Sequence, residues 1–195
     1  MVLDLLVEGY VDEAVATCLL CACGHEAGTT YGKRGWTYIE QKVRAFDLSC
    51  GKAGLLTLVD FMDTRLSCPP SVVSAWLPRP SAMHVFRVVV HEIESWVLAD
   101  RDAIASFLGV PKSKIPHDPD ILPDPKRTLI NLARTSRKRA LAAALVPVTD
   151  HAATEGPLYS SEIVRFVREQ WSPERARIQS SSLDRCMKRL SQLSM

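Results

Sequence analysis

The chain has 195 residues, of which 47% are hydrophobic, and its formal net charge at pH 7 is only +2. This much apolar material excludes a disordered chain and is enough for one sizeable core. No apolar run has membrane-spanning length and no charged-then-apolar leader opens the sequence. We therefore expect a cytoplasmic protein without membrane contacts, whose cysteines are reduced.

Short apolar runs alternate with helical patterns in the first half of the chain. The runs predicted as strands are Leu3–Val7, Thr29–Lys33, Leu55–Val59 and Val85–Val90. Helical spacing is found in Val11–Cys23, Trp36–Phe46, Glu92–Leu98 and Asp102–Leu108. Prolines between positions 69 and 80 leave room for at most one short helix. Such alternation is typical of a parallel sheet covered by helices. We expect a small parallel, Rossmann-like α/β domain over residues 1–110.

The second half has a different character. Five prolines interrupt residues 109–125, and we expect an irregular excursion there. Helical spacing then returns in Lys126–Arg134, Lys138–Leu145, Ser160–Trp171 and Ser182–Leu193, with loops at 147–157 and 172–181. Residues 111–195 are therefore expected to form a proline-rich excursion and a helical extension that packs on the α/β domain.

Carboxylates follow three of the four predicted strands. Glu8 comes after the first strand, Asp60 and Asp63 after the third, and Glu92 and Glu94 after the fourth. Because the carboxyl ends of parallel strands meet at one edge of a sheet, we expect these acids to lie together. Crowded carboxylates need compensating positive charge, which a hard divalent cation with oxygen ligands supplies. The sequence thus predicts a magnesium site, with manganese as the alternative cation.

The motif around the first of these acids is similar to a known family. The segment Val7-Glu8-Gly9-Tyr10-Val11-Asp12-Glu13 resembles the opening motif of Toprim domains, the metal-dependent module of topoisomerases, bacterial primases and OLD-family nucleases. Residues 91–96 (HEIESW), 124–127 (DPKR) and 156–159 (GPLY) are similar to an uncharacterised Toprim-like family of prokaryotic proteins. Members of that family are often encoded beside ATPases in defence-type loci. The Toprim resemblance covers about residues 1–110, and the narrower one runs the whole length.

The resemblance assigns roles to particular positions. In Toprim domains a glutamate ends the first strand and an Asp-x-Asp pair ends a later one. Glu8 matches the glutamate and Asp60 the first aspartate, which implies that both are catalytic and bind the metal. Met62 stands where the second aspartate is expected, and Asp63 lies one position on. Glu92 and Glu94 are then candidates for the missing ligands, as additional acids are in the nuclease branch.

Two functions remain open. The resemblance implies a metal-dependent nuclease or phosphodiester-cleaving effector that works with a partner ATPase in prokaryotic defence. Glu8 would bind magnesium or act as a general acid or base. The alternative is a non-catalytic Toprim-derived module that binds nucleic acid or a partner protein, in which Met62 records the loss of a metal position. For Asp12 and Glu13, a place in the first turn of a helix is an equally good explanation.

Basic residues gather in two stretches that are candidates for phosphate contacts. The candidate nucleic-acid-binding residues are Lys33, Arg34, Lys42, Arg44, Lys126 and Arg127. Contacts of this kind would give sequence-independent, salt-sensitive binding. A solvated helix face explains either stretch equally well. For residues 126–139, a docking surface for an acidic partner is also compatible.

The spacing of Cys18, Cys21, Cys23 and His25 hints at zinc. However, Cys18 and Cys21 fall within an apolar helical pattern, and no second Cys-x-x-Cys follows. We therefore expect reduced, structural cysteines, with Cys18 and Cys21 on the apolar side of the first helix and poorly accessible to thiol reagents.

Overall fold

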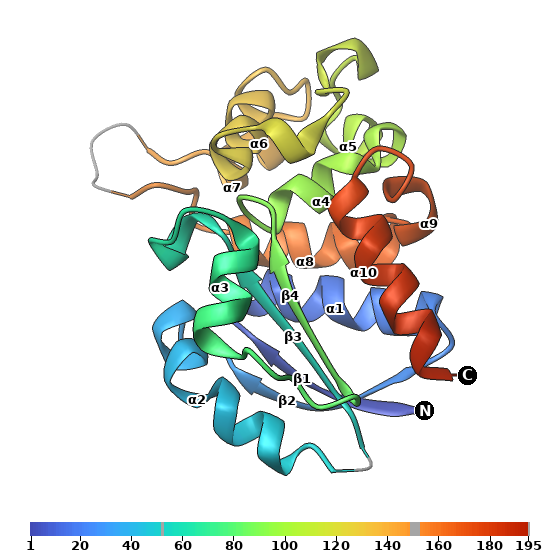
Figure 1. The fold of residues 1–195 in the computed structure, drawn as a ribbon. Coiled ribbons are helices and arrows are strands. Elements are labelled where there is room, and N and C mark those ends of the chain that lie inside the picture. Colours follow the sequence, from blue (N-terminus) through green and yellow to red (C-terminus); the bar gives the residue numbers. More distant parts are fainter. Residues whose placement is uncertain (52, 149–152, 195) are drawn as a thin grey trace.

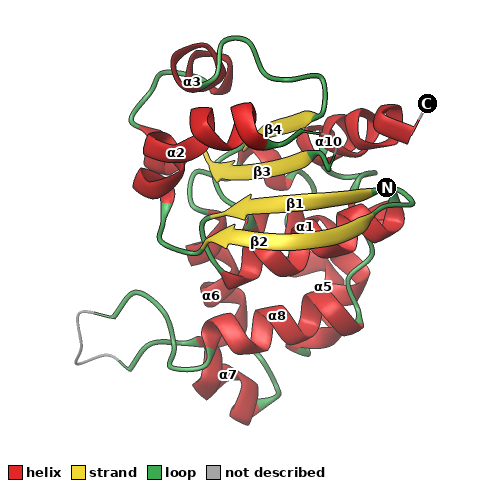
Figure 2. Cartoon of the chain, turned by 90° about the horizontal axis from the view of Figure 1, so that it is seen from below, coloured by secondary structure: helices red, strands yellow, loops and turns green. Residues whose placement is uncertain are grey.

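The computed structural model describes residues 1–51, 53–148 and 153–194 (Figure 1). Four strands form one all-parallel sheet in the order β2-β1-β3-β4 (Figure 2). The strands are β1 (Val2–Val7), β2 (Glu26–Gly32), β3 (Leu55–Asp60) and β4 (His84–Val89). The predicted α/β class with a parallel Rossmann-like sheet is confirmed. β2 begins three residues earlier than predicted, because this outer strand starts with polar and small residues that give no apolar signal.

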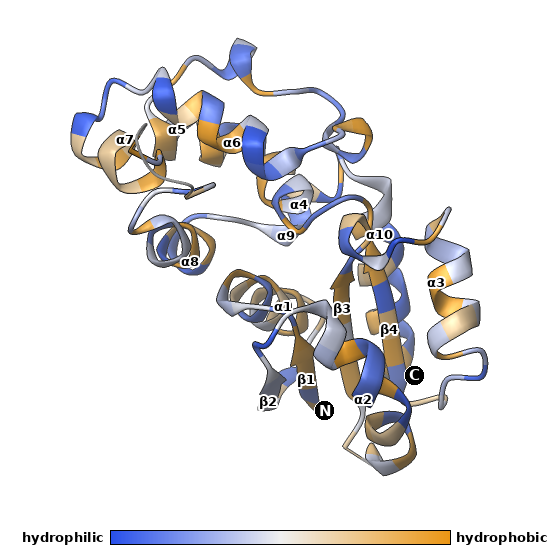
Figure 3. Ribbon diagram, turned by 90° about the vertical axis from the view of Figure 1, so that its left-hand side faces the viewer, coloured by the Kyte–Doolittle hydropathy of each residue, from blue (hydrophilic) through white to orange (hydrophobic). Residues whose placement is uncertain are grey.

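Three helices cover the two faces of the sheet. They are α1 (Tyr10–Ala22), α2 (Trp36–Ser49) and α3 (Pro69–Trp76). The chain crosses from β1 to β2 in one direction and from β2 back past β1 to β3 in the other. With right-handed crossovers, this reversal places α1 on one face and α2 on the other. Figure 3 shows α1 on the side opposite α2 and α3. The proline-rich approach to β4 contains the one short helix that the sequence allows.

The chain after β4 is built from helices, as predicted, and the first two of them lie within the predicted α/β domain of residues 1–110. Its helices are α4 (Glu94–Ala99), α5 (Arg101–Leu108), α6 (Pro125–Arg134), α7 (Arg139–Leu145), α8 (Tyr159–Glu169), α9 (Pro173–Ala176) and α10 (Ser181–Ser191). Short 3-10 turns are η1 (Met62–Thr64), η2 (Lys112–Lys114), η3 (Pro119–Ile121) and η4 (Gln192–Ser194).

Two predictions about loops need correction. The excursion at 109–125 is not wholly irregular, because η2 and η3 form within it. The predicted loop 172–181 contains α9, which begins at Pro173 after Ser172 accepts a hydrogen bond from the Arg175 N–H. Part of the predicted loop 147–157, residues 149–152, lies outside the described residues.

The helical extension shares one apolar core with the sheet. Leu5 and Leu58 of the sheet belong to the same buried cluster as Trp96 of α4 and Phe166 of α8. α8 packs along α1, and α10 packs against β4 (Figure 2). A second cluster fills the opposite face between the sheet and α2 and α3. None of the described helices combines the length and the apolar character that a membrane span requires.

Trp96 forms hydrogen bonds to the helical extension through both its ring and its backbone. Its side chain is 1% exposed, and its Nε1–H donates to Ser182 Oγ at 2.7 Å. Its carbonyl accepts the Nε1–H of Trp171 at 3.0 Å. Trp96 therefore joins α4 to α10 and to the segment after α8.

We predict that Trp96→Ala lowers the free energy of unfolding by about 3–5 kcal/mol, the usual cost of emptying a buried aromatic site. Urea unfolding followed by circular dichroism measures it. Leu48→Ala, at a residue that is 88% exposed, is the matched control and should change stability little. A loss for Trp96→Ala no larger than that of the control would contradict the shared core.

Candidate metal centre

The candidate site lies where the strand order reverses. β1 connects to β2 on one side and is flanked by β3 on the other, so the carboxyl ends of β1 and β3 border the switch point of the sheet. Ligands of open α/β sheets bind outside this point. Glu8 follows β1 directly, and Asp60 is the last residue of β3. Glu8 Oε1 accepts the backbone N–H of Asp60 at 2.7 Å, which holds the glutamate across the two strand ends.

Asp12 joins these two acids from the first turn of α1. Its side chain is buried, and its Oδ1 has no hydrogen-bond partner among the described residues. The Oδ1 of Asp60 is likewise shielded from solvent and without a partner there. Gly9 leaves room beside Asp12, because a Cβ at this position would come within 3.3 Å of Asp12 Oδ2. Two buried carboxylate oxygens are therefore free to accept a ligand.

Burial makes ionisation of these carboxyl groups unfavourable. Desolvation raises the pKa of Glu8 to about 8, and the nearby Asp12 and Asp63 add to the effect. Desolvation also raises the pKa of Asp12 to about 6, although backbone hydrogen bonds and Lys126 act against it. The pKa of Asp60 is raised well above its ordinary value by burial and by the charges of Asp12 and Glu8. The cluster thus favours bound protons or a cation.

The residues after β4 complete the cluster. Glu94 is 5% exposed, and its Oε1 accepts the Tyr159 hydroxyl at 2.9 Å. Burial raises the pKa of Glu94 to about 7. Glu92 is half-buried, and its Oε2 accepts the Lys126 N–H at 3.0 Å in the first turn of α6. The charges of Glu92 and Glu94 both raise the pKa of Asp60, so Asp60 of β3 and the two glutamates that follow β4 belong to one site.

Lys126 brings a positive charge to this site. Its Nζ pairs with Glu155 and lies 4.9 Å from the centre of the Tyr159 ring. Burial lowers the pKa of Lys126, but the hydrogen bond to Glu155 and the charge of Glu94 outweigh this and raise it. Its charge lowers the pKa of Asp12 and of Glu94. Lys126 therefore offsets part of the negative charge without pairing directly with the strand-end acids.

The position that departs from the Toprim pattern lies in η1, at the rim of the cluster. Met62 is 45% exposed, and its N–H donates to the carbonyl of His91 at 3.1 Å. His91 has a left-handed backbone with φ of 65°, which is uncommon for a residue other than glycine. Asp63 is exposed, yet its charge raises the pKa of Glu8, Asp12 and Glu92. It therefore stands close to the cluster without being buried in it.

The donor chemistry of the cluster suits a hard cation. No group of three or more His, Cys, Asp or Glu side chains in the described part of the chain is already arranged to hold a metal ion. The unpartnered oxygens, however, are carboxylate oxygens, the ligands that magnesium and manganese prefer. Glu8, Asp12, Asp60 and Glu94 are the residues that would hold such an ion.

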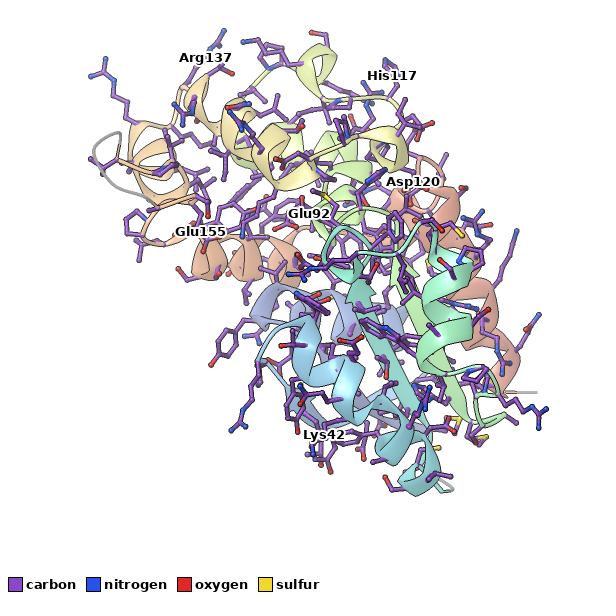
Figure 4. The ribbon with its side chains drawn as sticks, turned by 60° about the vertical axis from the view of Figure 1, so that its left-hand side comes forward. Lys42, Glu92, His117, Asp120, Arg137 and Glu155 are labelled. Atoms are coloured by element: carbon purple, nitrogen blue, oxygen red, sulfur yellow. The ribbon has the colours of Figure 1, made fainter. Side chains whose placement is uncertain are left out.

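Most residues of the first basic stretch contact other residues of the protein. Lys33 Nζ pairs with Glu13 at 3.1 Å and lies 5.2 Å from the centre of the Tyr10 ring, and Arg34 lies over the ring of Tyr38. These contacts give Glu13 a structural role. Arg44 donates to the last carbonyls of α3, those of Ala75 and Trp76. Lys42 is exposed on α2 and is well separated from Glu92 in Figure 4.

The second basic stretch reaches the site. A cavity of about 620 Å³ beside Glu92 is bordered by Lys126, Arg127 and Arg134 of α6. Arg127 and Arg134 are exposed and seven residues apart, so they share one face of the helix. Figure 4 shows Glu92 between the strand ends and the helical extension, with Arg137 on the outer side of that extension.

The expected position of Cys21 is wrong. Cys21 is exposed because it lies on the outer side of the last turn of α1, and we now expect thiol reagents to label it. Cys18 is half-buried, and its thiol donates to the carbonyl of Val167 on α8 at 3.5 Å. Cysteines and His25 in the described part of the chain form no group that could hold a metal ion.

Sequence reasoning missed three members of the site. Asp12 lies four residues after Glu8, but an acid in the first turn of a helix is equally well explained by the helix dipole. Tyr159 and Glu155 lie about 30 to 65 residues from the groups they contact, and no local pattern announces such pairs. Tyr159 belongs to the segment 156–159 that carries part of the family resemblance, which was the only available signal.

We predict that stability without divalent cations falls as the pH rises from about 5 to about 8. The pKa of Glu94 is raised from 4.5 to about 7, so in this window the native state keeps a proton that the unfolded chain has released. Glu94→Gln should remove part of this fall, on the order of 2 kcal/mol at the upper end. Urea unfolding at several pH values tests it, with Asp102→Asn as an exposed control. Stability that rises across the window would contradict the buried acidic cluster.

Comparison with known proteins identifies no family for this chain. No family model, no curated protein and no solved structure matches the chain significantly. The resemblance to Toprim domains is therefore carried by the motif residues alone.

Proposed function

We propose that the chain is a Toprim-like, metal-dependent enzyme that cleaves phosphodiester bonds in nucleic acid. The observation that carries this proposal is the pair of unpartnered, buried carboxylate oxygens of Asp12 and Asp60 beside Glu8 at the switch point of the sheet. A buried acidic cluster of this kind is costly to the fold, and its position is where α/β folds bind ligands. The match of Glu8 and Asp60 to the Toprim motif gives independent support.

The residues of the chain have distinct roles under this proposal. Bound magnesium or manganese supplies positive charge that offsets the charge of a phosphate and of the carboxylates. Glu8, with a pKa raised to about 8, is suited to take up or release a proton near neutral pH. Tyr159 holds Glu94 in place by its hydroxyl, and Glu155 tethers Lys126 near the same acids.

The cavity beside Glu92 supports a phosphate-bearing substrate. Arg127 and Arg134 border this cavity and have no ion-pair partner among the described residues. Guanidinium groups bind phosphate oxygens in a planar, two-point geometry. A nucleic-acid backbone that lies along this face of α6 would bring one phosphate near Glu92. The partner ATPase and the role in prokaryotic defence are part of the proposal through the family resemblance alone.

A second function is favoured by one observation. Met62 stands exposed where a second aspartate would complete the motif, and a thioether is a poor ligand for magnesium. In a non-catalytic module the acids would be a relic of an ancestral site, and the basic face of α6 would dock nucleic acid or an acidic partner. The two functions differ in whether a divalent cation binds at Glu8 and Asp60.

We predict that Glu8→Gln and Asp60→Asn each lower magnesium- or manganese-dependent cleavage by about 100-fold or more, because each removes a carboxylate that would bind the cation. One of Glu92→Gln and Glu94→Gln should act similarly. Labelled single-stranded and duplex DNA and RNA serve as substrates. Asp102→Asn, at an exposed aspartate, is the matched control and should keep full activity.

Met62→Asp should retain or raise the activity, because a carboxylate binds magnesium better than a thioether does. Wild-type protein that cleaves none of these substrates, and whose melting temperature is unchanged by either cation, would reject the enzyme and leave the binding module.

We also predict how the substrate face responds to salt. If Arg127 and Arg134 contact phosphates, Arg127→Ala and Arg134→Ala should each reduce the slope of log affinity against log salt by about 0.9 on duplex DNA. Lys42→Ala is the matched control, since this lysine is exposed on a different helix. Fluorescence anisotropy at several salt concentrations measures the slopes. An equal reduction for Lys42→Ala would contradict the placement of the substrate on α6.

A further inference from the structure

A groove with a volume of about 840 Å³ runs along β4, between α3 and α10. β4 is an outer strand of the described sheet, and Figure 1 shows it between these two helices. Three successive residues of the strand, Phe86, Arg87 and Val88, border the groove. Successive side chains point to opposite faces of a sheet, so a groove that touches all three lies along the edge of the strand.

The backbone at this edge is oriented toward the groove. The carbonyls of Met83 and Val89 accept hydrogen bonds from the N–H groups of Leu55 and Phe61, at 2.9 and 3.0 Å, on the β3 side. Backbone groups of successive residues alternate between the two sides of a strand. The N–H and C=O groups of Phe86 and Val88 therefore point outward, as a short row of donors and acceptors of the kind that strand addition uses.

The groove carries positive charge. Its cationic side chains are Arg87, Arg185, Lys188 and Arg189, and its described lining contains no Asp or Glu. Lys188 is paired with Asp184 at 2.7 Å, whereas Arg87 and Arg185 have no carboxylate partner in the described part of the chain. The Nε of Arg87 is shielded from solvent and has no hydrogen-bond partner there. A carboxylate entering the groove would meet the guanidinium groups of Arg87 and Arg185, neither of which has a carboxylate partner among the described residues.

We propose that this groove binds an extended acidic segment of a partner protein, which adds to the sheet as a strand beside β4. The outward edge offers both N–H and C=O groups, and a peptide backbone can match both, whereas a phosphate backbone supplies only acceptors. Apolar side chains of Pro69, Val73 and Phe86 line the same groove and suit alternate side chains of a strand. A second copy of this chain fits poorly, because the two sets of cations would face each other.

This binding site is independent of the proposed nuclease activity, since the groove shares no lining residue with the acidic cluster. Random peptides of about six residues, the usual length of a strand, are displayed and selected for binding to the full-length protein. We expect the selected peptides to be enriched in Asp and Glu, alternating with β-branched or aromatic residues. Their affinities are measured by fluorescence anisotropy.

Val88→Pro is the sharpest variant, because it removes an outward N–H while leaving the bonds to β3 in place. It should weaken the binding of the selected peptides about tenfold, which is the effect of losing one backbone hydrogen bond and disturbing its neighbours. Arg185→Glu should weaken them as well, and Arg168→Glu, at an exposed arginine of α8, should not. If Val88→Pro does not fold, slower hydrogen exchange of the Phe86 and Val88 amides in wild-type protein with peptide replaces that variant.

Several outcomes would overturn the proposal. One is a selection whose peptides are not enriched in Asp and Glu. Another is peptide binding that persists in Val88→Pro and leaves the amides of Phe86 and Val88 unprotected from hydrogen exchange. Displacement of the peptide by an oligonucleotide of equal charge would assign the groove to nucleic acid instead. Self-association of the wild-type protein that Val88→Pro abolishes would assign the edge to a second copy.

Discussion

Unfavourable burial of several carboxyl groups at the ends of β1 and β3 constrains the whole site. Asp12 and Asp60 each place an oxygen out of reach of solvent and of any described partner, and the pKa of both is raised. The fold compensates in part. The first turn of α1 carries Asp12, the first turn of α6 faces Glu92, and both helix ends favour negative charge. Lys126 adds a full positive charge nearby. What remains uncompensated is negative charge at the switch point, which protons or a divalent cation would neutralise.

This constraint also explains why the helical extension belongs to the site. Lys126 and Tyr159 lie within residues 111–195, yet Tyr159 donates to Glu94, and the charge of Lys126 lowers the pKa of Asp12 and Glu94. The charges of these two acids in turn raise the pKa of Asp60. The extension can position Lys126 and Tyr159 because it shares the main core with the sheet. The α/β unit supplies the acids of the cluster, and the extension supplies a hydroxyl that donates to Glu94 and an ammonium group that offsets part of the negative charge. A site divided in this way needs both parts of the chain.

Much of this arrangement could be predicted from sequence, and the reasons for the rest are physical. The strands were predictable because parallel strands buried on both faces read as continuous apolar runs, and the meeting of Glu8 with Asp60 follows from parallel topology. Side-chain partners that are far apart in the sequence could not be predicted. No local pattern encodes the contact of Tyr159 with Glu94 or of Arg44 with the end of α3. The exposure of Cys21 could not be predicted, because a small apolar residue can lie on either side of a helix. Only a clear pattern of apolar and polar neighbours shows which side is buried.

The proposed divalent cation would bind between the ends of β1 and β3. Manganese is a direct probe of this site, because it is paramagnetic and broadens the NMR signals of nearby nuclei. At substoichiometric manganese, we expect the amide signals of Gly9 and Phe61, which flank Glu8 and Asp60, to broaden first, and excess magnesium to restore them. Broadening confined to exposed acids elsewhere on the surface, or none at millimolar manganese, would rule out a cation at this position.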